Sequence, residues 1–150
     1  MPANTSPIFT LTPNIGRVAI AQASANTSSA GGGTIGSDIF LLFTAGSNGS
    51  FVERIKFMSV ASSANTAGVA TTLRVFLSTV GTGSTTAADT FLLGELSVPS
   101  VVSDHATNAS PPYEIQLGFA IPSGMYILIA QHVAQTANQN WVGIAIGGDY

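Results

Sequence analysis

The chain has 150 residues, enough for one ordinary domain, and it has no cysteine, which excludes disulfides and thiolate metal sites. Only four residues are basic and seven are acidic, and the net charge is −3. This balance lacks the basic patch of a nucleic-acid-binding or membrane-surface protein, so neither partner is expected. No apolar stretch approaches 18 residues, so no membrane span is predicted, and the N-terminus lacks the pattern of a secretory signal.

Residues 1–17 are expected to form an extended N-terminal arm. Three prolines in this segment remove backbone donors and fix φ, which disfavours a helix. The apolar side chains of the arm need a partner surface, on the same domain or on a neighbour; they are Ile8, Phe9 and Leu11.

Residues 18–150 are expected to form a single β-sandwich domain. Eight runs of strand-like composition are separated by turn residues, and no segment shows a sustained 3.6-residue apolar period. The segment 24–37 is rich in Gly, Ser and Ala, which predicts a flexible loop. The predicted strands are 18–23, 38–44, 51–60, 71–79, 90–98, 113–119, 125–131 and 141–147.

The number and spacing of these strands predict an all-β fold, an eight-stranded jelly-roll-like β-sandwich with an extended N-terminal arm. Strands that follow one another without helices indicate a sandwich or a barrel, and long loops with a late hairpin favour a jelly roll. An immunoglobulin-type sandwich is the alternative. It has less support because the only tryptophan, Trp141, lies in the last strand and a cysteine pair is absent.

No combination of residues indicates catalysis, a metal or a cofactor. His105 and His132 are 27 positions apart and do not form a metal motif. The carboxylates include no close pair typical of a glycosidase, although distant strands can bring two together. The sequence also lacks the Gly-x-Ser-x-Gly pattern of a nucleophile elbow. A non-enzymatic protein without a cofactor is therefore predicted.

The basic residues are candidates for contacts with a partner. Arg54 and Lys56 share one face of a predicted strand, and Arg74 lies on the next strand. They are either solvated charges at the rim, or Arg54 or Arg74 pairs with a carboxylate across a subunit boundary and sets the register there. The candidate partner-binding residues are Ile8, Phe9, Leu11, Arg17, Arg54 and Arg74.

The segment 36–55 contains LFTAG, NGS and VERI in a strand–turn–strand arrangement, followed by LRVFL at 73–77 and a C-terminal GGDY at 147–150. This layout resembles that of small structural proteins of tailed bacteriophages. The resemblance implies a virion component, namely a head decoration (cement) protein with a β-sandwich or jelly-roll fold. Such proteins often form trimers on the capsid exterior, so the implied partners are the major capsid protein and copies of the chain itself, which would be made in the host cytoplasm.

Two hypotheses for function follow from different classes of protein. A cement protein would stabilise the assembled shell by binding only that state. The alternative is a host-recognition domain of a tail fibre or spike that binds a surface glycan, since jelly rolls include lectins. Aromatic platforms for a sugar would then come from Tyr113, Tyr126, Trp141 or Tyr150.

Overall fold

The computed structural model describes residues 10–61, 66–103 and 109–150, and within these ranges the chain consists of strands, turns and loops. No helix in the described part of the chain is long and apolar enough to cross a membrane. Eight long strands form two four-stranded sheets, and four two-residue strands form two short ladders. The long strands are β1 (Thr12–Ile20), β3 (Phe40–Thr44), β4 (Ser50–Ala61), β6 (Thr71–Ser78), β8 (Thr90–Val98), β10 (Tyr113–Ile121), β11 (Tyr126–Gln131) and β12 (Gln139–Asp149). The short strands are β2 (Gly33–Thr34), β5 (Thr66–Ala67), β7 (Ser84–Thr85) and β9 (Val102–Ser103).

The order of the strands defines a jelly roll. One sheet has the order β1-β12-β4-β10, and the other has the order β3-β11-β6-β8. Among the eight long strands, the first pairs with the last, the second with the seventh, the third with the sixth and the fourth with the fifth, all antiparallel. This nested pairing arises when one long antiparallel ribbon rolls up into two packed sheets. The predicted all-β, eight-stranded jelly roll is therefore confirmed.

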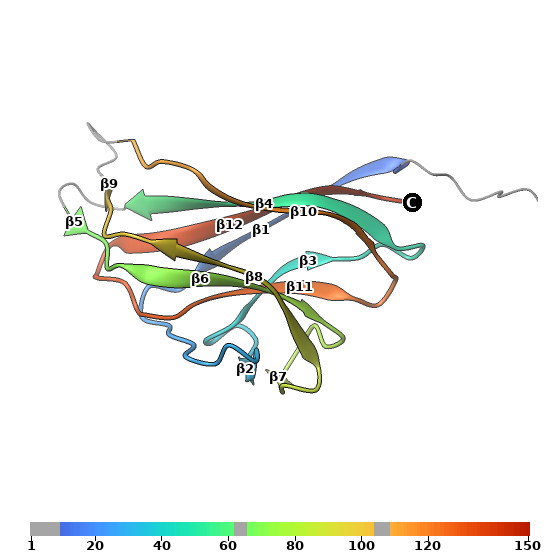
Figure 1. Cartoon of the computed structure of the whole chain (residues 1–150), viewed down its shortest axis with the longest axis horizontal. Coiled ribbons are helices and arrows are strands. Elements are labelled where there is room, and N and C mark those ends of the chain that lie inside the picture. The colour runs from blue at the N-terminus through green and yellow to red at the C-terminus, as the bar shows by residue number, and fades with distance from the viewer. Residues whose placement is uncertain (1–9, 62–65, 104–108) are drawn as a thin grey trace, which may run out of the picture.

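The two sheets lie one above the other, with the β1-β12-β4-β10 sheet uppermost in Figure 1. Alternate side chains from both inner faces form the main core, which includes Phe43, Phe57, Ile129 and Trp141. Such alternation is expected for two sheets that each have one buried face. The core thus fixes which side chains of each strand are left to point outward.

A second apolar cluster lies on the outer side of the lower sheet. Ile39, Phe76, Leu128 and Ala130 form it, together with the partly buried Ile35. Phe76 and Leu128 alternate with core residues on their strands, so they point away from the main core. The segment that follows β1, with the β2–β7 ladder, lies below this sheet in Figure 1 and covers the cluster.

This covering corrects the prediction of a flexible loop over 24–37. Asn26 Nδ2 donates to the Gly32 carbonyl at 3.0 Å, and Thr85 Oγ1 donates to the Gly31 carbonyl at 2.7 Å. Thr90 Oγ1 donates to the Ala30 carbonyl at 2.6 Å. Because side chains satisfy its backbone groups, a segment rich in Gly and Ser packs as a defined cover.

The first strand begins earlier than predicted. Residues 12–17, which were assigned to the arm, form the first two thirds of β1 and pair with β12 from Thr12↔Asp149 onward. Pro13 is compatible with this pairing because β1 is an edge strand, where a missing N–H can face away from the sheet. Residues 1–9 of the predicted arm lie outside the described residues.

A β-bulge in β4 changes which side chains face outward. Arg54 pairs with Ile146, whereas Val52 pairs with Gly147, so Glu53 is an extra residue on β4. Val52 and Ile55 both belong to the core. The bulge therefore turns Glu53 and Arg54, although adjacent in the chain, to the same outer side.

Candidate interaction surface

The outer side of the β1-β12-β4-β10 sheet is a face that no segment in residues 10–61, 66–103 and 109–150 packs against as a second apolar layer. Residues directly opposite each other on neighbouring strands share a face, so the register identifies its members. We call this surface the open face. Its members are Ile15 and Arg17 from β1, Val142, Ile144 and Ile146 from β12, Glu53, Arg54, Lys56 and Met58 from β4, and Glu114 and Gln116 from β10.

An apolar stripe runs along β12 and β1 in the middle of the open face. Val142, Ile144 and Ile146 alternate with the core residues Trp141 and Ala145, so all three lie on the outer side of the sheet, where Val142 is buried and Ile144 and Ile146 are half-buried. The stripe ends at the sheet edge with Ile15, which pairs with Ile146. The side chain of Ile15 is 65% exposed, an unusual state for an isoleucine in a strand.

Basic side chains flank the stripe on both sides. Arg17 pairs with Ile144 on the β1 side, and Lys56 pairs with Ile144 on the β4 side. One strand farther on, Glu114 pairs with Lys56. An ion pair joins Arg54 to Glu53, with 3.3 Å between Nη1 of Arg54 and Oε1 of Glu53. Exposed ion pairs of this kind contribute little to stability, so these charges remain available to a partner.

Arg54 is therefore a surface residue that pairs within its own chain. Strict alternation along the strand would place Glu53 on the opposite face from Arg54, but the bulge places both on one side. The prediction that Arg54 and Lys56 share a face is confirmed by their neighbours Ile146 and Ile144 on β12. Arg17 is exposed at the edge of the same face.

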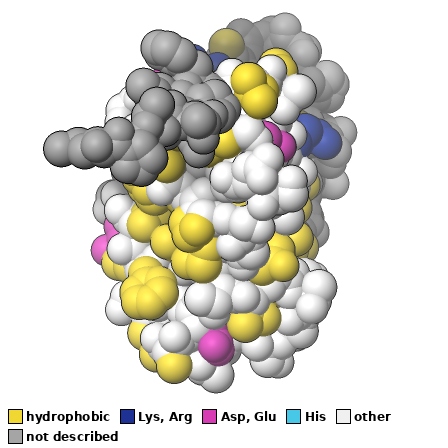
Figure 2. Space-filling view, turned by 90° about the vertical axis from the view of Figure 1, so that its right-hand side faces the viewer, with side chains coloured by type: hydrophobic (Ala, Val, Ile, Leu, Met, Phe, Trp, Pro, Cys, Tyr) yellow, Lys and Arg dark blue, Asp and Glu magenta, His cyan; other side chains and the backbone are white. Residues whose placement is uncertain are grey.

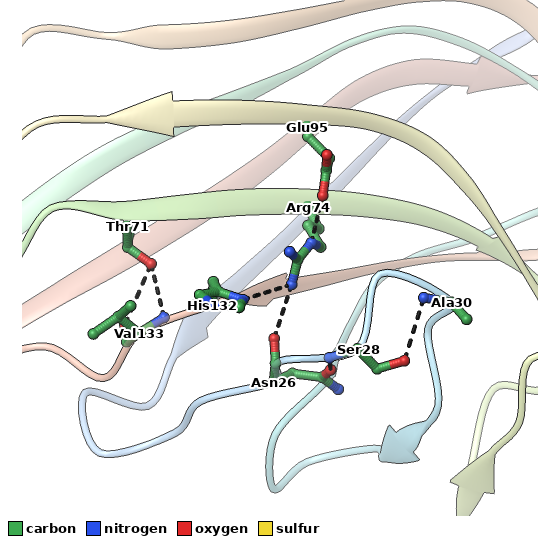
Figure 3. Close-up of polar contacts among 8 residues, drawn as sticks. All are labelled: Asn26, Ser28, Ala30, Thr71, Arg74, Glu95, His132 and Val133. Carbon is green, nitrogen blue, oxygen red and sulfur yellow. Dashed lines mark hydrogen bonds and ion pairs between the residues drawn. The ribbon is translucent and has the colours of Figure 1, made fainter.

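Arg74 belongs to a different part of the molecule, under the loop that covers the lower sheet (Figure 3). Its Nε donates to Glu95 Oε1 at 2.6 Å, and Nη1 donates to the Asn26 carbonyl at 3.0 Å. Nη1 also lies 3.1 Å from Nδ1 of His132. Because a guanidinium group can only donate hydrogen bonds, Nδ1 of His132 is the acceptor in this contact. The ring N–H of His132 is then on Nε2.

This geometry corrects both interpretations of Arg74. The side chain is buried, so it is not a solvated rim charge, and Glu95, its partner carboxylate, comes from the same chain. Arg74 and Glu95 face each other in the β6–β8 ladder. Arg74 therefore fixes the covering loop through its hydrogen bond to the Asn26 carbonyl.

Leu11 is the one of the three apolar contact residues proposed for the arm that lies within the described chain. Its side chain is 70% exposed, and its N–H donates to the Asp149 carbonyl at 2.7 Å. The segment that precedes β1 therefore leaves the domain beside the end of β12. Ile8 and Phe9 lie outside the described residues.

Asp149 joins three segments at this end of the domain. One carboxylate oxygen, Oδ1, accepts from Asn14 Nδ2 at 2.8 Å and from Ser50 Oγ at 2.5 Å. The hydrogen bonds from Asn14 and then Ser50 are the largest causes of a pKa of Asp149 below its ordinary value. Burial raises the pKa by less than either of these bonds lowers it, and the backbone N–H of Gly46 adds a small lowering effect. Asp149 thus holds β1 and the start of β4 to the end of β12.

The remaining candidate groups are histidines, carboxylates and aromatic side chains, most of which lie within residues 10–61, 66–103 and 109–150. Among the described residues, no three His, Cys, Asp or Glu side chains lie close enough to hold a metal. His132 contacts Arg74, and His105 lies outside the described residues. Trp141 is 2% exposed and packs edge-to-face on Tyr113, with 5.7 Å between ring centroids. Trp141 is therefore not available as a platform for a sugar.

The apolar stripe was not among the residues proposed from the sequence. Alternation along 141–147 places Val142, Ile144 and Ile146 on one face, but the apolar face of a strand is normally the buried one. The signal that could have identified the stripe is the other set of alternate residues on this strand, Trp141, Gly143 and Ala145. These large and small residues pack closely in the core, which leaves the apolar set on the outer side. Lys56 was noted beside Arg54 but was not proposed as a contact residue.

No protein-family model matches the chain, and no curated protein matches it. Two solved viral structures are similar in fold. A chain of the cyanophage Pam1 capsid asymmetric unit is 18% identical, with 98% of this chain and 97% of that chain covered and a TM-score of 0.40. A chain of the infectious bursal disease virus VP2 subviral particle is 14% identical, with 99% of this chain and 38% of that chain covered and a TM-score of 0.31. The fold assignment rests on the strand pairing.

Proposed function

We propose that this chain is a structural protein of a virion, and more specifically a decoration (cement) protein that binds the outer shell of a bacteriophage head. The observation that carries the proposal is the open face, a basic sheet surface with the exposed Ile15 and the half-buried Ile144 and Ile146, against which no segment of the described residues packs as a second apolar layer. Contiguous exposed apolar surface commonly marks an interaction site. The resemblance of 36–55 to small structural proteins of tailed phages directs the proposal to the phage head.

The mechanism we propose is thermodynamic. A protein that binds the assembled shell, and binds its unassembled subunits less well, stabilises the shell by mass action. In an oligomer, which we propose to be a homotrimer, several weak contacts act together and raise the overall affinity. The partners are then the major capsid protein and other copies of this chain, on the capsid exterior, after synthesis in the host cytoplasm.

The N-terminal segment is proposed to act as a contact arm. Leu11 is highly exposed, and the two residues Ile8 and Phe9 precede it closely in the sequence. Nine residues can extend over about 30 Å, which is enough to reach a neighbouring subunit. Arm exchange of this type is common in cyclic oligomers.

The experiment uses heads of the encoding phage that were assembled without this chain. Full-length protein is added, and electron microscopy measures its occupancy and symmetry on the shell. We expect specific decoration and a higher temperature of head disruption. A variant that lacks residues 1–9 should fold normally and show lower occupancy. Heads that stay bare and equally heat-labile at saturating protein would refute the proposed function.

The glycan-binding alternative has less structural support, because Trp141 is buried in the core. A glycan array with the full chain separates the two functions. Binding of a defined glycan, together with a location on the tail, would support host recognition instead of decoration.

A further inference from the structure

We propose that the open face docks onto an acidic, partly apolar protein surface of the virion shell. This inference rests on the proposed function and adds to it the contact surface and the chemistry of its partner. It depends on three observations: the distribution of charge, the apolar stripe between the cations, and the cover on the opposite sheet.

The few charges of the chain are unevenly distributed. Three of its four basic residues, Arg17, Arg54 and Lys56, lie on the open face beside two carboxylates, Glu53 and Glu114. The face therefore carries a formal charge of about +1, while the remaining residues hold one basic and five acidic side chains. In Figure 2 the dark-blue Lys and Arg atoms lie in the upper half of the view, and magenta atoms also occur lower down. A face of opposite sign to the net charge favours an acidic partner.

The geometry of the face specifies the partner further. Arg17, Ile144 and Lys56 lie side by side on three adjacent strands, so the two cations are separated by about two strand spacings, roughly 10 Å. A complementary surface places carboxylates about this far apart, with an apolar ridge between them against the stripe. The exposed Ile15 extends the apolar contact toward the sheet edge.

Symmetric pairing of two copies through this face is disfavoured by the same charges. In a twofold dimer each patch meets its own copy, so two surfaces that each carry a formal charge of about +1 face each other. Glu53 and Glu114 offset two of the three cations of each patch, which leaves one cation in excess on each side. A separate acidic surface of the shell satisfies the face better.

The test compares two double variants with the same change in net charge. R17Q/K56Q removes two cations from the open face, while S97E/S123E adds two carboxylates at exposed positions of β8 and of the turn before β11. Binding of full-length protein to heads assembled without it is measured between low and physiological salt. We expect R17Q/K56Q to bind at least tenfold more weakly and with a flatter salt dependence, and S97E/S123E to bind within about twofold of wild type.

A third variant, Ile15→Ser, tests the stripe. Ile15 is exposed, so its substitution should leave the domain folded. We expect severalfold weaker binding with unchanged salt dependence, and circular dichroism should show that all variants are folded. If wild type binds and both double variants bind equally well, the inference is wrong but the proposed function stands. If wild type does not bind heads at all, the proposed function and the inference both fail. If mass photometry shows an oligomer in wild type but a monomer in R17Q/K56Q, the face joins copies of the chain and the inference is overturned.

Discussion

The substitution Arg74→Met tests how the covering loop is held. The methionine fills a similar volume but removes three contacts, to Glu95, to the Asn26 carbonyl and to His132. The side chain of Glu95 is 41% exposed, so water solvates its carboxylate once Arg74 is replaced. Loss of this ion pair therefore costs about 1 kcal/mol or less. The buried Asn26 carbonyl loses a charged donor, which costs about 1–3 kcal/mol.

The expected loss of unfolding free energy for Arg74→Met is about 1–4 kcal/mol in total, mostly less than the ~3–5 kcal/mol typical of breaking a fully buried ion pair. Urea denaturation monitored by tryptophan fluorescence measures the change. Hydrogen exchange over residues 22–36 should accelerate more than exchange in β12, because Arg74 connects β6 to this loop through Asn26.

The matched control is Arg54→Met, the same chemical change on the open face. Arg54 has only its neighbour Glu53 as an ion-pair partner among the described residues, so we expect a loss of about 0–1 kcal/mol. The reasoning would be refuted if both variants had the same stability, or if the loop exchanged at the wild-type rate in Arg74→Met.

Two further predictions concern the frame of the sandwich. A Cβ added at Gly16 would lie 1.9 Å from the backbone oxygen of Leu42, so Gly16→Ala forces β1 away from β3 and should cost about 3 kcal/mol or more in urea denaturation. Gly143→Ala is its control, because the nearest atom is the tip of the Ile129 side chain at 2.4 Å, which can rotate, so we expect a loss of about 1 kcal/mol. The lowered pKa of Asp149 means that its contribution to stability is complete above the ordinary value of 3.8 and is lost as the pH falls through the folded-state value. Asp149→Asn should therefore be less stable than wild type at pH 7, and thermal melts below pH 3.8 should show the difference shrinking; a difference independent of pH would contradict this assignment.

The strands could be predicted because their signals are local. Alternation of apolar residues and Gly- or Pro-rich turns identified all eight long strands, and the last of them, 139–149, extended only a few residues beyond the predicted 141–147. The start of β1 was missed because the prolines of residues 1–17 led to the prediction of an extended arm, although proline is tolerated in an edge strand. An edge position depends on the whole sheet and has no local signature.

The environment of Arg74 could not be predicted for a similar reason. Its alternation with Leu73 and Val75 places it on the side of β6 opposite the core side chains. Whether that outer side is wet or covered depends on where the segment 24–37 lies, and composition suggested only flexibility. The hydroxyl and amide side chains that suggested a loop are the groups that make it a packed cover.

The open face depends on one irregularity in β4. With strict alternation from Val52 in the core, Arg54 would point inward, and burying its charge without a partner would cost several kcal/mol. The extra residue Glu53 in the ladder lets Val52 and Ile55 both remain in the core while Arg54 turns outward. The bulge thus explains the imperfect alternation of this strand and adds Arg54 to the open face as its third cation. An irregular stretch of sequence and the most basic surface of the molecule therefore have one structural cause.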